Sequence, residues 1–351
     1  MTLPIESALN VLSAAGRSRG ADELVERRIG AVQTFLAEDL LAVERVLGDT
    51  SDQASRPAAD AARHLVDQGG KRVRPMALLL GARCFVQEGS EALERIRRPL
   101  IEMAAVVELV HSATLLHDDV VDEGMERRGS ITARRRYGNG ISVLAGDFLL
   151  VQALERTGRH APALLGDLIQ TLGRLVDGEI VQLRGRSELD ASEETYLRIL
   201  SDKTASLFVF ATRAGALLAG ASPAHVDALA SYGESLGVAF QLVDDVLDYS
   251  GGNTGKNLFA DVVEGKMTLP LVLAMKDDAA LRELVRELHQ GRQENVPRIV
   301  ERVLASGACD TVRKRAQNVT QSAERALEAL PQSPARTLLS VVASEMTRRM
   351  S

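Results

Sequence analysis

The most constraining feature of the sequence is a pair of apolar segments that each run directly into an aspartate cluster. Residues 101–116 (IEMAAVVELVHSATLL) are apolar on nearly every side of a helix, and residues 229–243 form a comparable segment. A helix that is apolar all round belongs inside a helical bundle. The first segment leads into DDVVDEG at 118–124 and the second into DDVLDYSG at 244–251, which suggests an internal pseudo-repeat. We therefore expect two buried helices that end at similar acidic sites.

Composition favours an all-α fold around these helices. The 351 residues are 45% hydrophobic, which is enough for a substantial core, whereas aromatic residues make up only 3% and Trp is absent. Long stretches are built from Ala, Leu, Glu and Arg, which are strong helix formers. We predict a flexible amino-terminal segment over residues 1–20 and a single all-α domain over residues 21–351.

Charge and targeting signals narrow the class of protein. The net charge of −6 argues against a nucleic-acid partner, because phosphate contacts require a basic surface. Cys84 and Cys309 form neither a metal-spaced pair nor a disulfide framework, which suits a reducing cytoplasm. The first residues show no basic region followed by an apolar one, so we expect no secretory signal, and apolar runs such as residues 76–82 are too short to span a bilayer. We expect a cytoplasmic protein without a transmembrane segment.

The first aspartate cluster has the spacing of a metal site. Asp118 and Asp122 lie one helical turn apart on the same face, with Asp119 close to both. Like charges at this spacing repel unless a cation compensates, and carboxylate oxygens with room for water and phosphate suit Mg²⁺. The second cluster repeats the spacing with Asp244, Asp245 and Asp248.

The duplication of the cluster decides between two interpretations. An isolated DDxxD is more simply explained as a solvated helix end. Two copies, each after a buried helix, instead favour a pair of facing sites that clamp a diphosphate through bridging metal ions. Such a clamp would neutralise charge on a departing pyrophosphate and so promote ionisation of a carbon–oxygen bond.

Basic residues elsewhere could supply the matching positive charge. GGKRVRP at 69–75 places three cations beside two glycines and a helix-starting proline, which together can bind an anion. Basic loops are nevertheless usually just solvated, and this applies equally to Arg127 and Arg128. His111 lies two helical turns before Asp118 on nearly the same face, which favours a functional role over that of a satisfied core histidine. Taken alone, Lys203, Thr204 and Gln241 carry no pattern that points to function, so each would be interpreted as a structural residue.

Seven segments in order resemble the trans-prenyltransferase, or polyprenyl diphosphate synthase, family. They are GGKRVRP, LLHDDVVDEGMERRG, AGDFLL, GEIVQL, KTA, QLVDDVLDYSGG and GKMTLP, and they span about residues 64–270. LPQSPAR at 330–336 extends the resemblance. Chance could supply one such segment but hardly seven in order.

The resemblance implies an all-α bundle around a deep central cavity, the isoprenoid synthase fold, usually as a homodimer. It implies a Mg²⁺-dependent head-to-tail condensation of isopentenyl diphosphate with an allylic diphosphate. The allylic substrate ionises, the isopentenyl double bond attacks, and a proton is lost to the released pyrophosphate. No protein nucleophile is required.

The resemblance also assigns roles to individual residues. The implied metal ligands are Asp118, Asp119, Asp122, Asp244 and Asp248, with Asp245 among the catalytic residues. The implied isopentenyl diphosphate ligands are Lys71, Arg74, His111 and Arg128. The implied allylic diphosphate ligands are Arg127, Lys203 and Lys256, while Thr204 and Gln241 would face the developing carbocation.

Product length in this family is limited at the fifth and fourth positions before the first aspartate motif. These are Ala113 and Thr114, which are small, and Val110 and Val107 further along the helix are also modest in size. We therefore expect a long product, in the octaprenyl to decaprenyl range used for quinone side chains.

The sequence departs from the family pattern after the second motif. Gly255 and Lys256 are followed by Asn257 to Ala260, where the family often has proline and glycine. Phe259 in a position where glycine is common would restrict the backbone, which bears on the role of Lys256.

Three alternatives stay open. The first is a shorter-chain geranylgeranyl or farnesyl diphosphate synthase, which product analysis would distinguish. The second is a non-catalytic partner subunit, which typically lacks one aspartate motif, whereas both are complete here. The third is a metal-stabilised helical scaffold, which leaves the basic loop unexplained.

Overall fold

Helices make up most of the chain in the computed structural model, which describes residues 30–51, 56–66, 68–127, 129–250 and 259–348. The described α-helices are α3 (Ala37–Ser51), α4 (Arg56–Val66), α5 (Val73–Arg83), α6 (Glu91–Val121), α7 (Ala133–Tyr137), α8 (Asn139–His160), α9 (Leu165–Glu188), α10 (Glu193–Ile199), α11 (Ser206–Leu218), α12 (Pro223–Ser250), α13 (Ala260–Val263), α14 (Leu269–Met275), α15 (Ala279–His289), α16 (Val296–Ala305), α17 (Ala308–Leu327) and α18 (Pro334–Arg348). Short 3₁₀ turns cover Pro162–Leu164 and Gln293–Asn295, and a π-helical turn covers Leu200–Ala205. Within these residues the strands are β1 (Glu126–Arg127) and β2 (Ser130–Ile131), which pair antiparallel. The all-α prediction is confirmed.

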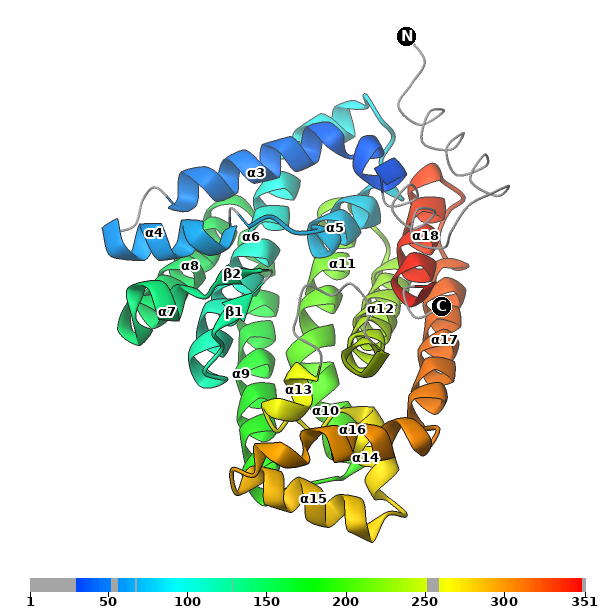
Figure 1. Ribbon diagram of the computed structural model, residues 1–351. Helices are drawn as coiled ribbons and strands as arrows, with labels where there is room; N and C mark the ends of the chain where they lie inside the picture. Colours follow the sequence, from blue (N-terminus) through cyan, green and yellow to red (C-terminus); the bar gives the residue numbers. More distant parts are fainter. Residues whose placement is uncertain (1–29, 52–55, 67, 128, 251–258, 349–351) are drawn as a thin grey trace.

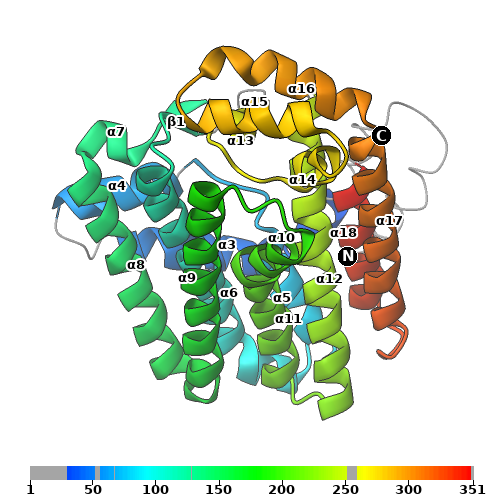
Figure 2. The same ribbon diagram turned by 90° about the horizontal axis from the view of Figure 1, so that it is seen from below.

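The long helices run side by side and are flanked by shorter ones. Figure 1 shows α3 and α4 across the top of the view and α14, α15 and α16 across the bottom, and Figure 2 shows α9, α11, α12 and α17 roughly parallel. Seen from below, α8 and α9 form one side of the molecule and α17 the opposite side (Figure 2). This arrangement places the ends of α6 and α12 near the same end of the bundle.

Helix α6 is the first of the two predicted buried helices. It begins at the N-cap Ser90, whose Oγ accepts a hydrogen bond from Leu93 N at 3.2 Å, and continues for 31 residues to Val121. By length and composition α6 could cross a bilayer, but 78% of its most apolar window is buried inside the protein. It is therefore a core helix, packed against α5, α8 and α11.

Helix α12 is the second, and the two helices belong to a core with two parts. The larger apolar cluster includes α5, α6 and α11, and the smaller one joins the end of α12 to α14, α15 and α16. Both predicted helices end at their aspartate motifs, as expected from the sequence. The predicted flexible segment 1–20 lies outside the described residues, and the single domain over residues 21–351 stays a prediction.

Candidate active site

A cavity of about 910 Å³ lies where α6, α9 and α12 approach one another. Twelve of the residues predicted from the sequence line it: Arg74, His111, Thr114, Asp118, Asp119, Asp122, Arg127, Lys203, Thr204, Gln241, Asp244 and Asp245. Lys71, Ala113 and Asp248 are not among the lining residues. Arg128 and Lys256 lie outside the described residues.

The first aspartate motif lies at the carboxyl end of α6, where the helix dipole is negative and repels carboxylates. Compensating cations come from other elements. Lys203 Nζ lies 3.4 Å from Asp118 Oδ2 and also pairs with Glu179 of α9. Arg127 of β1 donates to Asp119 Oδ1 through Nε at 2.9 Å and Nη2 at 2.8 Å. Burial raises the pKa of Asp119, and Arg127 opposes that rise.

Asp122 is held by two cations that come from distant parts of the chain. Arg186 Nη2 lies 2.7 Å from its Oδ1, and Lys266 Nζ lies 3.0 Å from its Oδ2. Lys266 also pairs with Glu264 at 2.6 Å and Asp261 at 3.7 Å. Burial works to raise the pKa of Asp122, but Lys266 and Arg186 outweigh it and the pKa lies below its ordinary value. Asp122 is therefore a carboxylate at neutral pH.

The π-helical turn that carries Lys203 and Thr204 is wedged between two glycines. A Cβ atom on Gly178 of α9 would lie 2.9 Å from Lys203 N, and one on Gly237 of α12 would lie 2.5 Å from the α-carbon of the adjacent Ala205. Side chains at either position would push the turn away. The close approach lets Thr204 Oγ1 donate to Gln241 Oε1 at 3.1 Å. Such π-turns frequently occur at functional sites.

The second motif contains a carboxylate that is almost completely enclosed. Asp245 is 2% exposed, and it accepts from Gln241 Nε2 at 2.9 Å, Tyr196 OH at 2.8 Å and Leu269 N at 3.0 Å. Burial raises the pKa of Asp245 to about 7, and the bond from Gln241 opposes the rise. Asp245 thus ties α12 to α10 and to the start of α14.

The other two aspartates of the second motif lie differently. Asp244 lines the cavity, whereas Asp248 is 6% exposed and is not among the lining residues. Among the described residues, no three His, Cys, Asp or Glu side chains are grouped as a ready-made metal cage. Asp119 Oδ2, however, is buried without a hydrogen-bond partner in the described structure, which suits an oxygen that binds a cation.

Arg74 brings the basic loop to the same cavity. Its guanidinium lies 4.5 Å above the ring of Phe208, and its Nε is buried without a hydrogen-bond partner among the described groups. Burial lowers the pKa of Arg74 to about 10, which leaves it protonated at neutral pH. His111 also lines the cavity, whereas Lys71 is exposed outside it.

The remaining wall of the cavity is apolar. It is formed by Leu115, Leu150, Leu172, Leu175, Val176 and Phe240. Thr114 lines the cavity, but its neighbour Ala113 is completely buried in the hydrophobic core, as are Val110 and Val107. Ala113, Val110 and Val107 therefore do not line the cavity, because that part of α6 is covered by its neighbours. The cavity instead extends along α8, α9 and α12.

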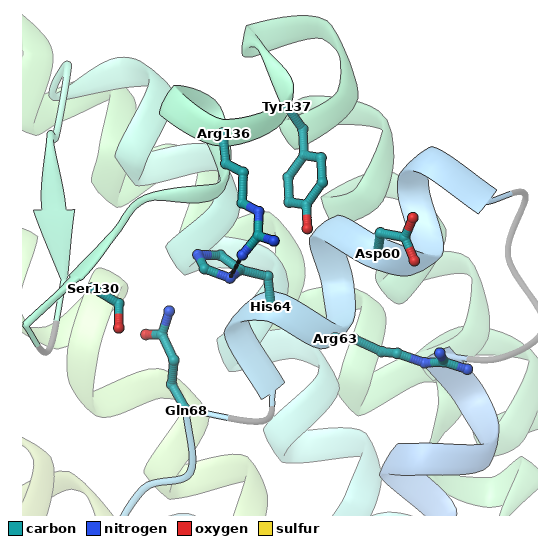
Figure 3. A pocket seen from close by; sticks show the side chains of 7 residues that line it. All are labelled: Asp60, Arg63, His64, Gln68, Ser130, Arg136 and Tyr137. Atoms are coloured by element: carbon teal, nitrogen blue, oxygen red, sulfur yellow. Dashed lines mark hydrogen bonds between the residues drawn. The ribbon is translucent and has the colours of Figure 1, made fainter.

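A second, more open depression of about 580 Å³ lies on the surface between α4 and α7. Figure 3 shows Arg136 and Tyr137 reaching toward His64, whose Nδ1 lies 3.5 Å from Arg136 Nη1. His64 Nε2 lies 2.6 Å from the carbonyl of Ile131 and so connects α4 to the β1–β2 hairpin. None of the residues predicted to be functional lines this depression, so the larger cavity is the candidate site.

Sequence reasoning missed several residues at the site, among them Lys266, Glu179 and Arg186. Lys266 lies in GKMTLP and Glu179 lies in GEIVQL, which are two of the seven segments that carry the family resemblance. Arg186 lies two helical turns after Glu179 and hence on nearly the same face of α9, which is a signal that could have found it.

Comparison with known proteins places the chain in a family. The polyprenyl synthetase family model matches residues 56–306. Octaprenyl diphosphate synthase of Escherichia coli (strain K12) is 36% identical over 315 residues, which cover 88% of this chain and 95% of that enzyme. Heptaprenyl diphosphate synthase component 2 of Geobacillus stearothermophilus is 32% identical over 92% of this chain and 99% of that protein.

A solved structure agrees with this placement. The crystal structure of polyprenyl synthase from Caulobacter crescentus CB15, complexed with calcium and isoprenyl diphosphate, matches with a TM-score of 0.83. The sequence identity is 35%, and the match covers 92% of this chain and 98% of that one. Together with the family model over 56–306, these matches show that the chain belongs to the polyprenyl synthetase family.

Proposed function

We propose that this protein catalyses the Mg²⁺-dependent head-to-tail condensation of isopentenyl diphosphate with an allylic diphosphate, and that it makes a long all-trans polyprenyl diphosphate. The observation that carries the proposal is the cavity itself. Aspartates from α6 and α12 and cations from four other segments surround its polar end, and leucine and phenylalanine side chains line the rest. A diphosphate fits the first part and a growing hydrocarbon chain fits the second.

The cations bound to the first motif are the proposed diphosphate ligands. Lys203, Arg127, Arg186 and Lys266 are held near the cavity by carboxylates, so they are already oriented. A substrate diphosphate would offer these groups stronger charge-assisted hydrogen bonds. They would then stabilise the negative charge that grows on the departing pyrophosphate. Lys256 is proposed as a further allylic diphosphate ligand.

The proposed metal ligands are Asp118, Asp119, Asp122, Asp244 and Asp248. Mg²⁺ commonly binds through one or two carboxylates together with substrate phosphates, so a preformed cage is not required. The buried, unpartnered Oδ2 of Asp119 fits this donor set. When bound, the metal would neutralise charge on the diphosphate as the carbon–oxygen bond breaks. Asp248 would have to turn toward the cavity, because its side chain is 6% exposed and does not line it.

The second substrate is proposed to bind beside the basic loop. Arg74 and His111 line the cavity and would contact the diphosphate of isopentenyl diphosphate, with Lys71 and Arg128 completing the set. Thr204 and Gln241 present polar atoms to the cavity close to the second motif, where they would face the carbocation. Released pyrophosphate would accept the proton, so the proposed reaction requires no protein nucleophile.

The apolar wall supports a long product. Thr114 is small, and the cavity continues past it along Leu150 and Leu172. The named products of the relatives, octaprenyl and heptaprenyl diphosphates, support a quinone side-chain precursor. We place the reaction in the cytoplasm.

A second copy of the chain is the proposed partner. Leu144 and Val151 lie two turns apart on α8 and are each 58% exposed, and Ile169 of the contacting helix α9 is 55% exposed. An exposed apolar face of this kind marks an interaction surface, and a symmetric homodimer would cover it. A heteromeric assembly is the alternative, because one relative is named as component 2 of a heptaprenyl diphosphate synthase. Sedimentation of the wild type and of a Leu144→Glu, Val151→Glu variant would distinguish the dimer from the monomer.

The experiment that tests the function uses purified protein with isopentenyl and farnesyl diphosphates. We expect Mg²⁺-dependent pyrophosphate release and long prenyl products on chromatography. Asp118→Ala and Asp244→Ala should each abolish turnover. Unchanged activity in both variants would refute the mechanism, and a farnesyl or geranylgeranyl product alone would refute the predicted length.

A further inference from the structure

Arg72 belongs to the basic loop but does not face the cavity that Arg74 lines. Its side chain is 8% exposed and lies between two carboxylates. Nε lies 2.6 Å from Glu44 of α3, and Nη1 lies 2.6 Å from Glu108 of α6. Nη2 also donates to the carbonyl of Val66 at the end of α4. One guanidinium therefore connects α3, α4 and α6 to the start of α5.

The backbone of Arg72 is in an unusual conformation. Its φ of 49° and ψ of 38° are left-handed, which is unfavourable for a residue with a Cβ atom. Such a residue persists only where its surroundings hold it in place. Here it forms the N-cap of α5, and Arg74 in the first turn of that helix lines the cavity.

Glu108 links Arg72 to the groups that face the cavity. It is 5% exposed and lies one helical turn before His111 on α6. Burial works to lower the pKa of Arg74, and the charge of Glu108 opposes this. The same carboxylate therefore fixes Arg72 by hydrogen bonding and stabilises the charge of Arg74 without lining the cavity.

We propose that Arg72 is a positioning residue for isopentenyl diphosphate, which holds the basic loop against α6 so that Arg74 and His111 converge on one diphosphate. This inference rests on the proposed function, which assigns that diphosphate to Arg74 and His111. A guanidinium is needed because its planar fork holds Glu44 at Nε and Glu108 at Nη1 in a fixed geometry, whereas a lysine ammonium is a point charge without that geometry. The positive charge alone is not sufficient.

The test compares Arg72→Lys with Arg83→Lys. Arg83 is a matched control, because it is also a buried arginine of α5 that pairs with two carboxylates, Asp39 at 2.6 Å and Glu88, but it does not line the cavity. Calorimetry measures the affinity of each purified protein for isopentenyl diphosphate and for farnesyl diphosphate, and thermal denaturation measures stability. We expect Arg72→Lys to weaken binding of isopentenyl diphosphate by about tenfold or more, because displaced ligands lose their alignment. Arg83→Lys should lower the melting temperature and leave both affinities unchanged.

A second variant, Glu44→Gln, tests the same inference if Arg72→Lys does not fold. Glu44 is 46% exposed, so Glu44→Gln should fold and should weaken isopentenyl diphosphate binding in the same direction by a smaller factor. Equal loss of affinity for both substrates in Arg72→Lys, or wild-type affinity in both the Arg72 and Glu44 variants, would overturn the inference. Wild-type protein that binds isopentenyl diphosphate without turnover would refute the proposed function, and the affinity comparison would still decide this inference.

Discussion

Lys266 Nζ lies 3.0 Å from Asp122 Oδ2, so the segment between α13 and α14 reaches the end of α6. Burial works to lower the pKa of Lys266, but Asp261, Asp122 and Glu264 outweigh it and the pKa lies above its ordinary value. Lys266 is therefore charged at neutral pH. Lys266 follows the second aspartate motif in the sequence. Through this ion pair it places a positive charge beside Asp122, the last aspartate of the first motif.

Replacing Lys266 should slow the reaction without unfolding the protein. Loss of one preorganised electrostatic group typically lowers kcat by about 10²-fold or more, so we expect Lys266→Gln to lower kcat on that scale. Steady-state pyrophosphate release measures kcat. Lys276→Gln is the control, because Lys276 is exposed at the end of α14 and outside the cavity lining. If kcat for Lys266→Gln equals that of the control, Lys266 is only a structural ion pair.

The raised pKa of Asp245 predicts that the stability of the metal-free protein depends on pH. Its pKa is raised to about 7 by burial, so between its unfolded pKa near 4 and about 7 the folded state binds more protons than the unfolded state. The stabilising contribution of this group is therefore complete below about pH 4 and is lost as the pH rises to about 7.

The corresponding measurement is chemical denaturation with chelator at several pH values from 5 to 8. Asp245→Asn removes the titration, so its stability relative to wild type should rise with pH by at most about 1.4 kcal/mol per unit and level off above about pH 7. Parallel pH profiles for the two proteins would show that the carboxyl does not titrate in this range.

The helices that carry the site could be predicted because their signals are local. An unbroken apolar segment followed by DDxxD predicts both a buried helix and its end, and α6 and α12 have this form. The ion pairs could not be predicted in this way. Arg186 and Asp122 are 64 residues apart, and nothing in either local sequence specifies the other. Only the tertiary fold, which brings the carboxyl ends of α6 and α9 to the same cavity, joins them.

Ala113 and Thr114 show a second limit of sequence reasoning. Consecutive helical residues point about 100° apart, so only one of the two needs to face the cavity. In an amphipathic helix the polar face would reveal which one. Helix α6 is apolar all round, so its orientation depends on its neighbours, and they enclose Ala113 and leave Thr114 at the cavity.

This difference predicts distinct effects for phenylalanine at the two positions. Thr114→Phe should place a ring in the cavity and shift the product toward shorter chains with little loss of stability. Ala113→Phe should overpack the core and cost about 1–3 kcal/mol, even where it also shortens the product. Chromatography of the products and thermal denaturation separate the two effects. An unchanged product distribution for Thr114→Phe would mean that chain growth does not pass this residue.

Phe259 offers a test of backbone strain next to the site. It precedes α13 with a φ of 63°, the left-handed region, and its N–H donates to the carbonyl of Asp248 at 3.2 Å. Because Phe259 is also partly buried against the smaller apolar cluster, its truncation alone would mix lost packing with relieved strain. Comparing Phe259→Gly with Phe259→Ala removes most of the packing in both variants and leaves the backbone preference as the main difference.

Glycine should be the more stable of these two variants by about 1 kcal/mol, since the left-handed conformation costs alanine about that much. This is the reverse of the usual order, in which glycine is less stable than alanine within a helix. Denaturant unfolding of both variants measures the difference. If alanine were equally stable or more stable, residue 259 would have to leave the left-handed region without cost, and the hydrogen bond to Asp248 would not hold it there.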